Sequence, residues 1–377
     1  MKRKEFTDFY KGKKVLITGH TGFKGSWLCA ILKQMGADVC GYALAAPAPS
    51  LFYLTNMAEG IRSVEGDIRD LRHMQSVFDD FTPEIVIHMA AQPIVRESYL
   101  QPVLTYETNV MGTVHMLECV RKCKSVRSVV NVTTDKVYFN KEQEQGYVET
   151  DILDGYDPYS NSKSCSELVT HSYIQSFLEA QGVAVSTCRA GNVLGGGDFA
   201  KDRIIPDCVR AAFADEAVIL RNPHSTRPYQ HVLEPLFVYL TVAMKQYENP
   251  VYAGCYNVGP DDQNNVTTGV LADRFCHLWN AFEAEEGGDD SGSFSSELRY
   301  KIQGDGGPHE AGFLKLDCTK LKSMFLWQPT WNIDDTLRRI VEFEKKRMQL
   351  ERDHASADAT AQALNACMQK QISEFLG

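Results

Sequence analysis

The sequence lacks any apolar run near the roughly 20 residues that a membrane-spanning helix needs. Its basic start, MKRKEFTDFYKGKK, is not followed by the apolar core of a secretory signal. Basic charge is also scarce, since 39 Lys and Arg stand against 49 Asp and Glu, for a net charge of -10. These absences argue against a membrane or nucleic-acid partner. They predict a cytoplasmic protein that holds any anionic ligand with a local cluster of basic side chains.

Cysteine is present, but the pattern of a disulfide scaffold is missing. Eleven cysteines are scattered through 377 residues, which indicates reduced thiols in a chain of this kind. Cys119 and Cys123 lie four apart in HMLECVRKC, a spacing that binds a metal only with further His or Cys partners. Ordinary packing of buried cysteines is the favoured explanation of this pair, and we expect no metal site.

Short β-branched runs alternate with helical patterns from Lys13 onward. The runs are KKVLIT, DVCGYAL, IRSVEGD, PEIVIHMAA and SVVNV. Such alternation predicts an α/β fold, a Rossmann-like doubly wound parallel sheet with a smaller C-terminal α/β substrate-binding domain. We expect long helices over 103–122 and 159–180. The predicted units are a dinucleotide-binding domain over 10–190 with a return near 230–258, a substrate-binding domain mainly over 191–345, and a polar helix-prone tail over 346–377.

A glycine-rich loop, TGHTGFKG, follows the first predicted strand. Gly19, Gly22 and Gly25 allow the backbone to approach a pyrophosphate while the next helix points its N-terminal N–H groups at it. A tight turn is the simpler alternative, but the position between a strand and a helix favours a dinucleotide site. Thr21 and Phe23 of the same loop are expected to contact the cofactor.

The end of the second strand bears on the choice between NAD and NADP. The acidic residue expected there to hold the adenosine ribose is replaced by Ala45. An arginine that would favour a 2′-phosphate is also missing, so NAD is the predicted cofactor. Asp67 ends the third strand beside Ile68, and it either reaches the adenine or caps the following helix.

A tyrosine and a lysine in DPYSNSKSC lie one helical turn apart. An ammonium on Lys163 and a nicotinamide cation would each lower the pKa of the Tyr159 phenol, which is about 10 when unperturbed. Tyr159 could then accept a proton from an alcohol while a hydride leaves the same carbon. An exposed helical pair is the alternative.

Several motifs together resemble one family, the extended short-chain dehydrogenases/reductases that act on nucleotide sugars. The resemblance is carried by TGHTGFKG, by HMAAQ at residues 88–92, and by YSNSK. Longer stretches, including AAQPIVRESY, TDKVY, AGNVLGGGDFAKDRIIP and RPYQHVLEP, are similar to the branch of 4,6-dehydratases that act on CDP-glucose. The similarity extends from about Gly12 to Val341, in matching order and spacing.

The resemblance implies roles for further residues. NAD would be a retained catalyst, with Ala90, Ala91, Gln92 and Asn109 among its contacts. Thr134 would hydrogen-bond the sugar O4 beside Tyr159. Asp135 matches the aspartate of the family's aspartate–glutamate pair. Lys136 stands where most of these relatives have the glutamate, and a lysine at that place is the pattern of the CDP-glucose branch. Our hypothesis is that Asp135 protonates the C6 hydroxyl and Lys136 assists removal of the C5 proton. A surface ion pair is the alternative.

Substrate binding and assembly are likewise implied by the resemblance. The expected substrate residues, for a CDP-glucose diphosphate and base, are Asn192, Arg203, Arg221 and Arg227. Any of these arginines could instead be a solvated surface charge. A homodimer, or a higher homo-oligomer, is expected through the helices at 103–122 and 159–180. The rival functions are a 4-epimerase, a dehydratase for another nucleotide sugar, or a non-catalytic NAD-binding sensor.

Overall fold

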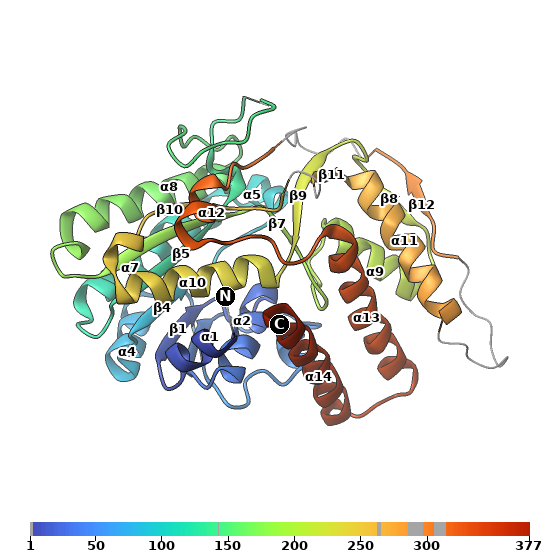
Figure 1. The fold of residues 1–377 in the computed structure, drawn as a ribbon, viewed down its shortest axis with the longest axis horizontal. Coiled ribbons are helices and arrows are strands. Elements are labelled where there is room, and N and C mark those ends of the chain that lie inside the picture. Colours follow the sequence, from blue (N-terminus) through green and yellow to red (C-terminus); the bar gives the residue numbers. More distant parts are fainter. Residues whose placement is uncertain (1–2, 142, 262–264, 286–296, 305–313) are drawn as a thin grey trace.

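Seven strands form the central sheet of the molecule (Figure 1). The computed structural model describes residues 3–141, 143–261, 265–285, 297–304 and 314–377. In spatial order the strands are β10 (Cys255–Val258), β6 (Ala184–Ala190), β5 (Ser128–Thr134), β4 (Ile85–His88), β1 (Lys14–Thr18), β2 (Asp38–Ala43) and β3 (Arg62–Glu65). Every pairing among them is parallel. The predicted doubly wound α/β class is confirmed, and the order reverses between β1 and β4.

Neighbouring residues of each strand enter two different apolar cores. In β1, Val15 and Ile17 enter one core and Leu16 enters the other. The first core is covered by α1 (Arg3–Tyr10), α2 (Phe23–Gln34), α10 (Leu233–Glu248) and α14 (Ala357–Leu376). The second is covered by α4 (Leu71–Phe81), α7 (Gly112–Lys122) and α8 (Pro158–Tyr173). Burial on both faces explains why these strands are continuous apolar runs in the sequence.

A separate core lies on the right of Figure 1. It is formed by α9 (Ile204–Ala214), α11 (Thr268–Glu285), α13 (Ile333–Arg352) and the paired strands β8 (Val218–Leu220) and β12 (Tyr300–Ile302). A small sheet of β7 (Asn192–Leu194), β9 (Thr226–His231) and β11 (Asn265–Thr267) adjoins it. The remaining short segments are α3 (Leu51–Leu54), α5 (Val95–Leu100), η2 (Asp135–Val137), η4 (Pro250–Tyr252) and α12 (Thr319–Phe325).

The two long predicted helices each contain a π-helical turn. The first consists of α6 (Pro102–Tyr106), η1 (Glu107–Met111) and α7, and the second of α8 followed by η3 (Ile174–Leu178). Such turns often occur at functional positions, and η1 contains Asn109, one of the predicted cofactor residues. No helix among the described residues has both the length and the apolar character required to cross a bilayer.

Both ends of the described chain pack on α10. The ring of Phe237 lies 5.4 Å from that of Phe6 in α1 and 5.0 Å from that of Phe375 in α14. Leu364 and Met368 of α14 are fully buried in the same core. The last helix thereby covers α2, the helix that follows the glycine-rich loop.

Candidate active site

A cleft of about 1150 Å³ opens at the carboxyl ends of β4, β5 and β6. Ligands of doubly wound sheets bind at this edge, beside the point where the strand order reverses. Its lining includes every predicted catalytic and substrate residue, namely Thr134, Asp135, Lys136, Tyr159, Lys163, Asn192, Arg203, Arg221 and Arg227. Basic side chains outnumber acidic ones along the lining by eight (Lys24, Arg96, Lys136, Lys141, Lys163, Arg203, Arg221, Arg227) to six (Asp135, Asp154, Asp157, Asp198, Asp202, Asp207). The cleft therefore reverses the acidic balance of the chain.

The glycine-rich loop lies between β1 and α2. Gly19 has a φ of +79°, and a Cβ there would lie 2.8 Å from the backbone nitrogen of Ala90. A Cβ on Gly25 would collide with the Gly19 carbonyl. Gly22 is the N-cap of α2 and supplies no capping side chain, so the first N–H groups of the helix are left for a ligand. The loop has the form of an anion cradle.

In the segment after β3, the Asp67 carboxylate is held by hydrogen bonds from Arg69. The carboxylate accepts hydrogen bonds from the backbone nitrogen of Arg69 at 2.8 Å and from Arg69 Nη2 at 2.7 Å. These bonds hold the pKa of the carboxyl below its usual range. Asp70, rather than Asp67, caps α4 by accepting a hydrogen bond from His73 N. Ile68 is buried beside Gly112 of α7. The helix-cap alternative for Asp67 is therefore wrong.

Buried hydrogen bonds brace the loop that follows β4. Asn109 Oδ1 accepts a hydrogen bond from Gln92 N at 2.8 Å, and Asn109 Nδ2 donates one to Ser162 Oγ of α8 at 2.9 Å. Gln92 Nε2 donates to Thr105 Oγ1 at 2.9 Å. Ala91, in the same loop, lines the cleft. Asn109 and Gln92 thus hold this loop against α8 through their side chains.

The TTDKVY segment places three polar residues at the end of β5. Thr134 Oγ1 donates to Asp135 Oδ1 at 2.9 Å, and Lys136 Nζ lies 3.1 Å from the same oxygen. Lys136 also donates to Asn192 Oδ1 at 3.4 Å. Asp135 is 1 % exposed, and within the described residues its Oδ2 has no hydrogen-bond partner. The pair is an ammonium in contact with a carboxylate that has one oxygen still unused.

Tyr159 and Lys163 stand in the first turns of α8, which begins after the Asp157 cap. Lys163 Nζ donates to the carbonyl of Val132 at 3.1 Å, and burial lowers the pKa of Lys163 to about 8. Burial raises the pKa of Tyr159 to about 12, although a hydrogen bond with Thr134 opposes this shift. The expected lowering of the phenol pKa is therefore not found in the protein alone, because loss of water contact raises this pKa more than the Thr134 hydrogen bond and the Arg203 charge lower it.

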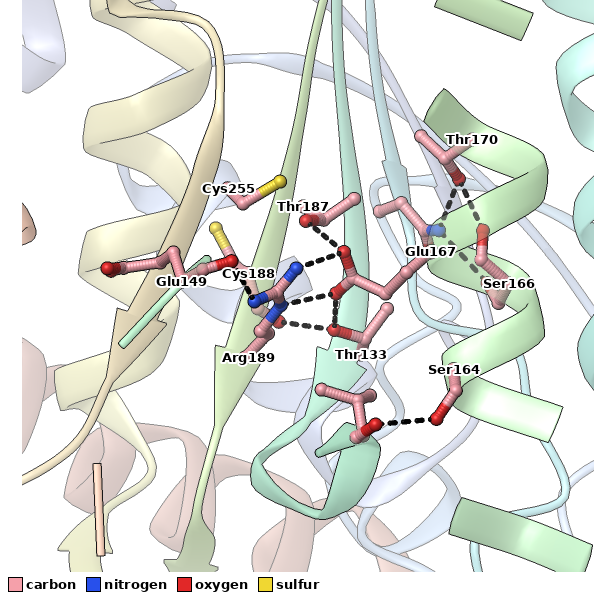
Figure 2. A network of polar contacts seen from close by, with 12 residues as sticks. Thr133, Glu149, Ser164, Ser166, Glu167, Thr170, Thr187, Cys188, Arg189 and Cys255 are labelled. Atoms are coloured by element: carbon pink, nitrogen blue, oxygen red, sulfur yellow. Dashed lines mark hydrogen bonds and ion pairs between the residues drawn. The ribbon is translucent and has the colours of Figure 1, made fainter. Parts of the chain in front are cut away.

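A buried network behind the cleft joins β5, β6 and α8 (Figure 2). Arg189 forms two hydrogen bonds of 3.0 Å to Glu167, and both side chains are 2 % exposed. The hydroxyls of Thr133 and Thr187 donate to the same carboxylate at 2.5 and 2.6 Å. Glu167 follows Lys163 by one turn of α8, and its charge opposes the lowering of the lysine pKa. The network fixes the helix that carries Tyr159 against the strand that carries Thr134.

The predicted substrate arginines come from separate segments around the cleft. Arg203 Nη1 lies 3.2 Å from Asp198 Oδ2, and Arg221 Nη2 lies 3.2 Å from Asp207 Oδ2. Arg227 is 6 % exposed and donates to the carbonyl of Thr226 at 3.0 Å. All three line the cleft, and their role in substrate binding stays a prediction.

Sequence reasoning missed three charged residues at or behind this cleft. Lys24 lines it from the first turn of α2, and Glu167 and Arg189 form the buried pair behind it. Arg189 could have been noticed, because an arginine within a buried strand requires a buried acceptor. Its partner could not, because the spacing of the two residues does not indicate contact. Lys24 was overlooked because the motif was interpreted through its glycines and through Thr21 and Phe23 as cofactor contacts.

Comparison with known sequences places this cleft in a family. A sequence model of the family described as GDP-mannose 4,6 dehydratase matches residues 16–340. The chain is 44 % identical over 376 residues to a CDP-glucose 4,6-dehydratase of Salmonella typhimurium, which covers 98 % of both chains. It is 28 % identical over 205 residues, half of this chain and 59 % of the relative, to a CDP-paratose 2-epimerase of Salmonella typhi.

Solved structures share the fold at lower identity. A dTDP-glucose 4,6-dehydratase of Bacillus anthracis in complex with NAD aligns with a TM-score of 0.72 at 20 % identity, covering 90 % of this chain and 98 % of the other. A UDP-glucose 4-epimerase of Thermus thermophilus in complex with NAD aligns with a TM-score of 0.74 at 23 % identity, covering 88 % and 98 %. At these identities the likeness establishes the architecture and leaves the chemistry to the site itself.

Proposed function

The chain belongs to the GDP-mannose 4,6-dehydratase family, and from this membership we propose that it converts CDP-D-glucose to CDP-4-keto-6-deoxy-D-glucose and water. The observation that carries the proposal is the presence of Thr134, Asp135, Lys136, Tyr159 and Lys163 in one cleft. The full-length relative at 44 % identity supports the choice of CDP-glucose. A 4-epimerase has no elimination step and so no need for an acid–base pair beside the tyrosine.

The cradle between β1 and α2 fits NAD as the cofactor of this reaction. Gly19, Gly22 and Gly25 keep the backbone accessible, and the uncapped start of α2 suits a diphosphate. The exposed Ala45 after β2 offers no cation for a 2′-phosphate, which supports NAD over NADP. When bound, NAD would accept the hydride from C4 of the sugar and return it to C6 after water has left.

The oxidation step is assigned to the residues around the phenol. We assign Tyr159 as the group that takes the proton of the C4 hydroxyl. The Thr134 hydroxyl forms a hydrogen bond with the same phenol. Burial raises the pKa of Tyr159 to about 12, so the phenol keeps its proton in the protein alone. We propose that it loses this proton when a cationic ligand lies beside it, because a nearby cation lowers the pKa of the phenol. Lys163, held by the Val132 carbonyl, is positioned as the amine of α8 that, in its protonated form, supports the phenol.

The elimination step is assigned to Asp135 and Lys136, with roles opposite to the hypothesis from sequence. Lys136 Nζ lies 3.1 Å from Asp135 Oδ1, the geometry of an ammonium–carboxylate contact, which suits Lys136 to donate rather than to accept a proton. The free Oδ2 of Asp135 is then the acceptor for the C5 proton, and the Lys136 ammonium is the donor to the departing C6 hydroxyl. The C5–H electron pair forms the C5–C6 double bond as the C6–O bond breaks, and the hydroxide leaves as water.

The nucleotide of the substrate is assigned to the arginine side of the cleft. Guanidinium groups bind diphosphates through paired hydrogen bonds, and Arg203, Arg221 and Arg227 line this side.

We also propose that two chains associate through the helices α7 and α8. Leu168 of α8 and Phe177 of η3 leave 56 % and 42 % of their surface exposed, which supports such a contact. Light scattering of the purified chain tests the dimer.

The reaction is tested with CDP-glucose deuterated at C4. The proposal expects a product that has lost the C6 hydroxyl and carries the deuterium at C6, as shown by mass spectrometry and NMR. A product inverted at C4 with its C6 hydroxyl retained would identify an epimerase. Binding of CDP-glucose and NAD without any turnover would identify a sensor. Turnover of dTDP-, UDP- or GDP-sugars in preference to CDP-glucose would retain the chemistry and reject the assigned nucleotide.

A further inference from the structure

Lys24 is a basic residue of the cleft that neither the oxidation nor the elimination step uses. It is the second residue of α2, two residues after the Gly22 cap, and its side chain lines the cleft. Its amine lies 5.9 Å from the centre of the Tyr239 ring of α10. Lys24 therefore sits at the meeting point of the glycine-rich loop and the catalytic groups.

The charges around Lys24 leave it without a neutralising partner. Lys163 of α8 and Arg203 before α9 act on its amine with the same sign of charge. Asp135 is the acid that acts on it, and that carboxylate is already paired with Lys136. Over the described part of the chain, no hydrogen bond or ion pair involves the Lys24 amine. The neighbouring Tyr239 hydroxyl, itself fully buried, also has no partner there.

An amine in this position is poised to change its protonation state. Burial, followed by the charges of Lys163 and Arg203, lowers the pKa of Lys24 to about 7. A partly buried cation that faces two other cations gains most from an anion. The N-terminus of α2, with its uncapped N–H groups, attracts an anion to the same place.

We propose that Lys24 binds a diphosphate group in the cleft and takes up a proton as that group binds. The position of Lys24 on the cradle helix favours the diphosphate of the dinucleotide over that of the nucleotide sugar. The inference rests on the proposed cofactor. In the empty cleft the amine is partly neutral, which limits repulsion from Lys163 and Arg203. With the diphosphate present, the charged form is stabilised and contributes to affinity.

Titration calorimetry in buffers of different ionisation enthalpy measures the protons taken up on binding. The experiment uses the full-length chain freed of bound nucleotide, with NAD in one arm and CDP in the other. At pH 7 the wild type is expected to take up about half a proton per NAD, and Lys24→Met none. Lys24→Arg should bind NAD without proton uptake, because arginine is always charged. Loss of the charged contact in Lys24→Met should weaken NAD binding by about 10- to 100-fold.

A matched control comes from the other end of the same helix. Lys33 lies in the last turn of α2 and donates to the carbonyl of Glu59, so Lys33→Met should leave both proton uptake and affinity unchanged. Uptake with CDP in place of NAD would move the site to the nucleotide sugar. No uptake by the wild type with either ligand, or equal uptake by Lys24→Met, would overturn the inference. Failure of NAD to bind at all would instead reject the proposed function.

If Lys24→Met does not fold, the wild type and Lys24→Arg still decide the matter. Equal proton uptake by these two proteins would exclude Lys24 as the group that titrates.

The same variants distinguish a second role, in which Lys24 is the base that removes the C5 proton. In that case Lys24→Met would bind NAD normally without a change in proton uptake, and exchange of the C5 hydrogen with solvent would stop.

Discussion

Arg189 is a buried basic side chain and Lys24 a partly buried one, and the protein treats the two in opposite ways. Arg189 donates two parallel hydrogen bonds to the Glu167 carboxylate, and the hydroxyls of Thr133 and Thr187 donate to the same carboxylate (Figure 2). The pKa of the arginine is raised. Lys24 receives an aromatic ring and two other cations, and its pKa is lowered. A buried charge with every partner present belongs to the scaffold. A partly buried charge in a cleft whose partner is missing is available to a ligand.

The largest expected effect comes from breaking the complete pair. Glu167→Gln leaves the Arg189 guanidinium buried without its counter-charge, so the free energy of unfolding should fall by about 3–5 kcal/mol. Urea denaturation followed by circular dichroism measures the change. The control is Glu118→Gln, which breaks a partly exposed pair with Arg121 on α7 and should cost less than about 1 kcal/mol. Equal losses in the two variants would show that the Glu167–Arg189 pair is not a structural brace.

The next effect concerns the pair that faces the cleft with one oxygen unused. Asp135→Asn removes the proposed acceptor and should stop exchange of the C5 hydrogen with solvent, lowering turnover by about 100-fold or more. Lys136→Met removes the proposed donor, so C5 exchange should persist while loss of water slows. NMR in deuterated water separates the two steps. The reverse pattern would restore the roles expected from sequence, and unchanged turnover in both variants would reject any role for the pair.

The sequence predicted the elements whose pattern is local. β1, the glycine-rich loop and the strand-end TTDKVY follow from apolar runs, glycine spacing and polar residues placed where a strand ends. The family resemblance added Asn192 and the three arginines, and the structure brings them to the same cleft. Each of these depends on a few adjacent residues or on a known motif.

The features that escaped prediction depend on contacts between distant segments. The pairing of Glu167 with Arg189 requires α8 and β6 to be placed side by side. The raised pKa of Tyr159 reflects burial, which a spacing of four residues from Lys163 does not reveal. The sequence allowed Asp135 and Lys136 to be a surface ion pair, and the structure shows the pair with its carboxylate buried; our reversed assignment of their roles rests on that contact and stays a proposal. The isolation of Lys24 is a missing contact, and a sequence pattern does not display missing contacts.

The smallest expected effect tests the incomplete charge through stability alone. The folded pKa of Lys24 is about 7, below the roughly 10.4 of an unfolded lysine. Between these values the unfolded chain binds more protons, so the cost of burying the charge is fully present below about pH 7 and is relieved as pH rises. Lys24→Met never bears this cost.

The difference in unfolding free energy, wild type minus Lys24→Met, should therefore rise by about 1–2 kcal/mol between pH 6.5 and pH 8.5. Urea denaturation in the absence of nucleotide measures both proteins at each pH, and their shared cysteines and carboxylates cancel in the difference. Lys33→Met should run parallel to the wild type, because its amine lies at the exposed end of α2. Parallel curves for Lys24→Met as well would mean that Lys24 already has a counter-charge in the free protein, and the contrast with Arg189 would then disappear.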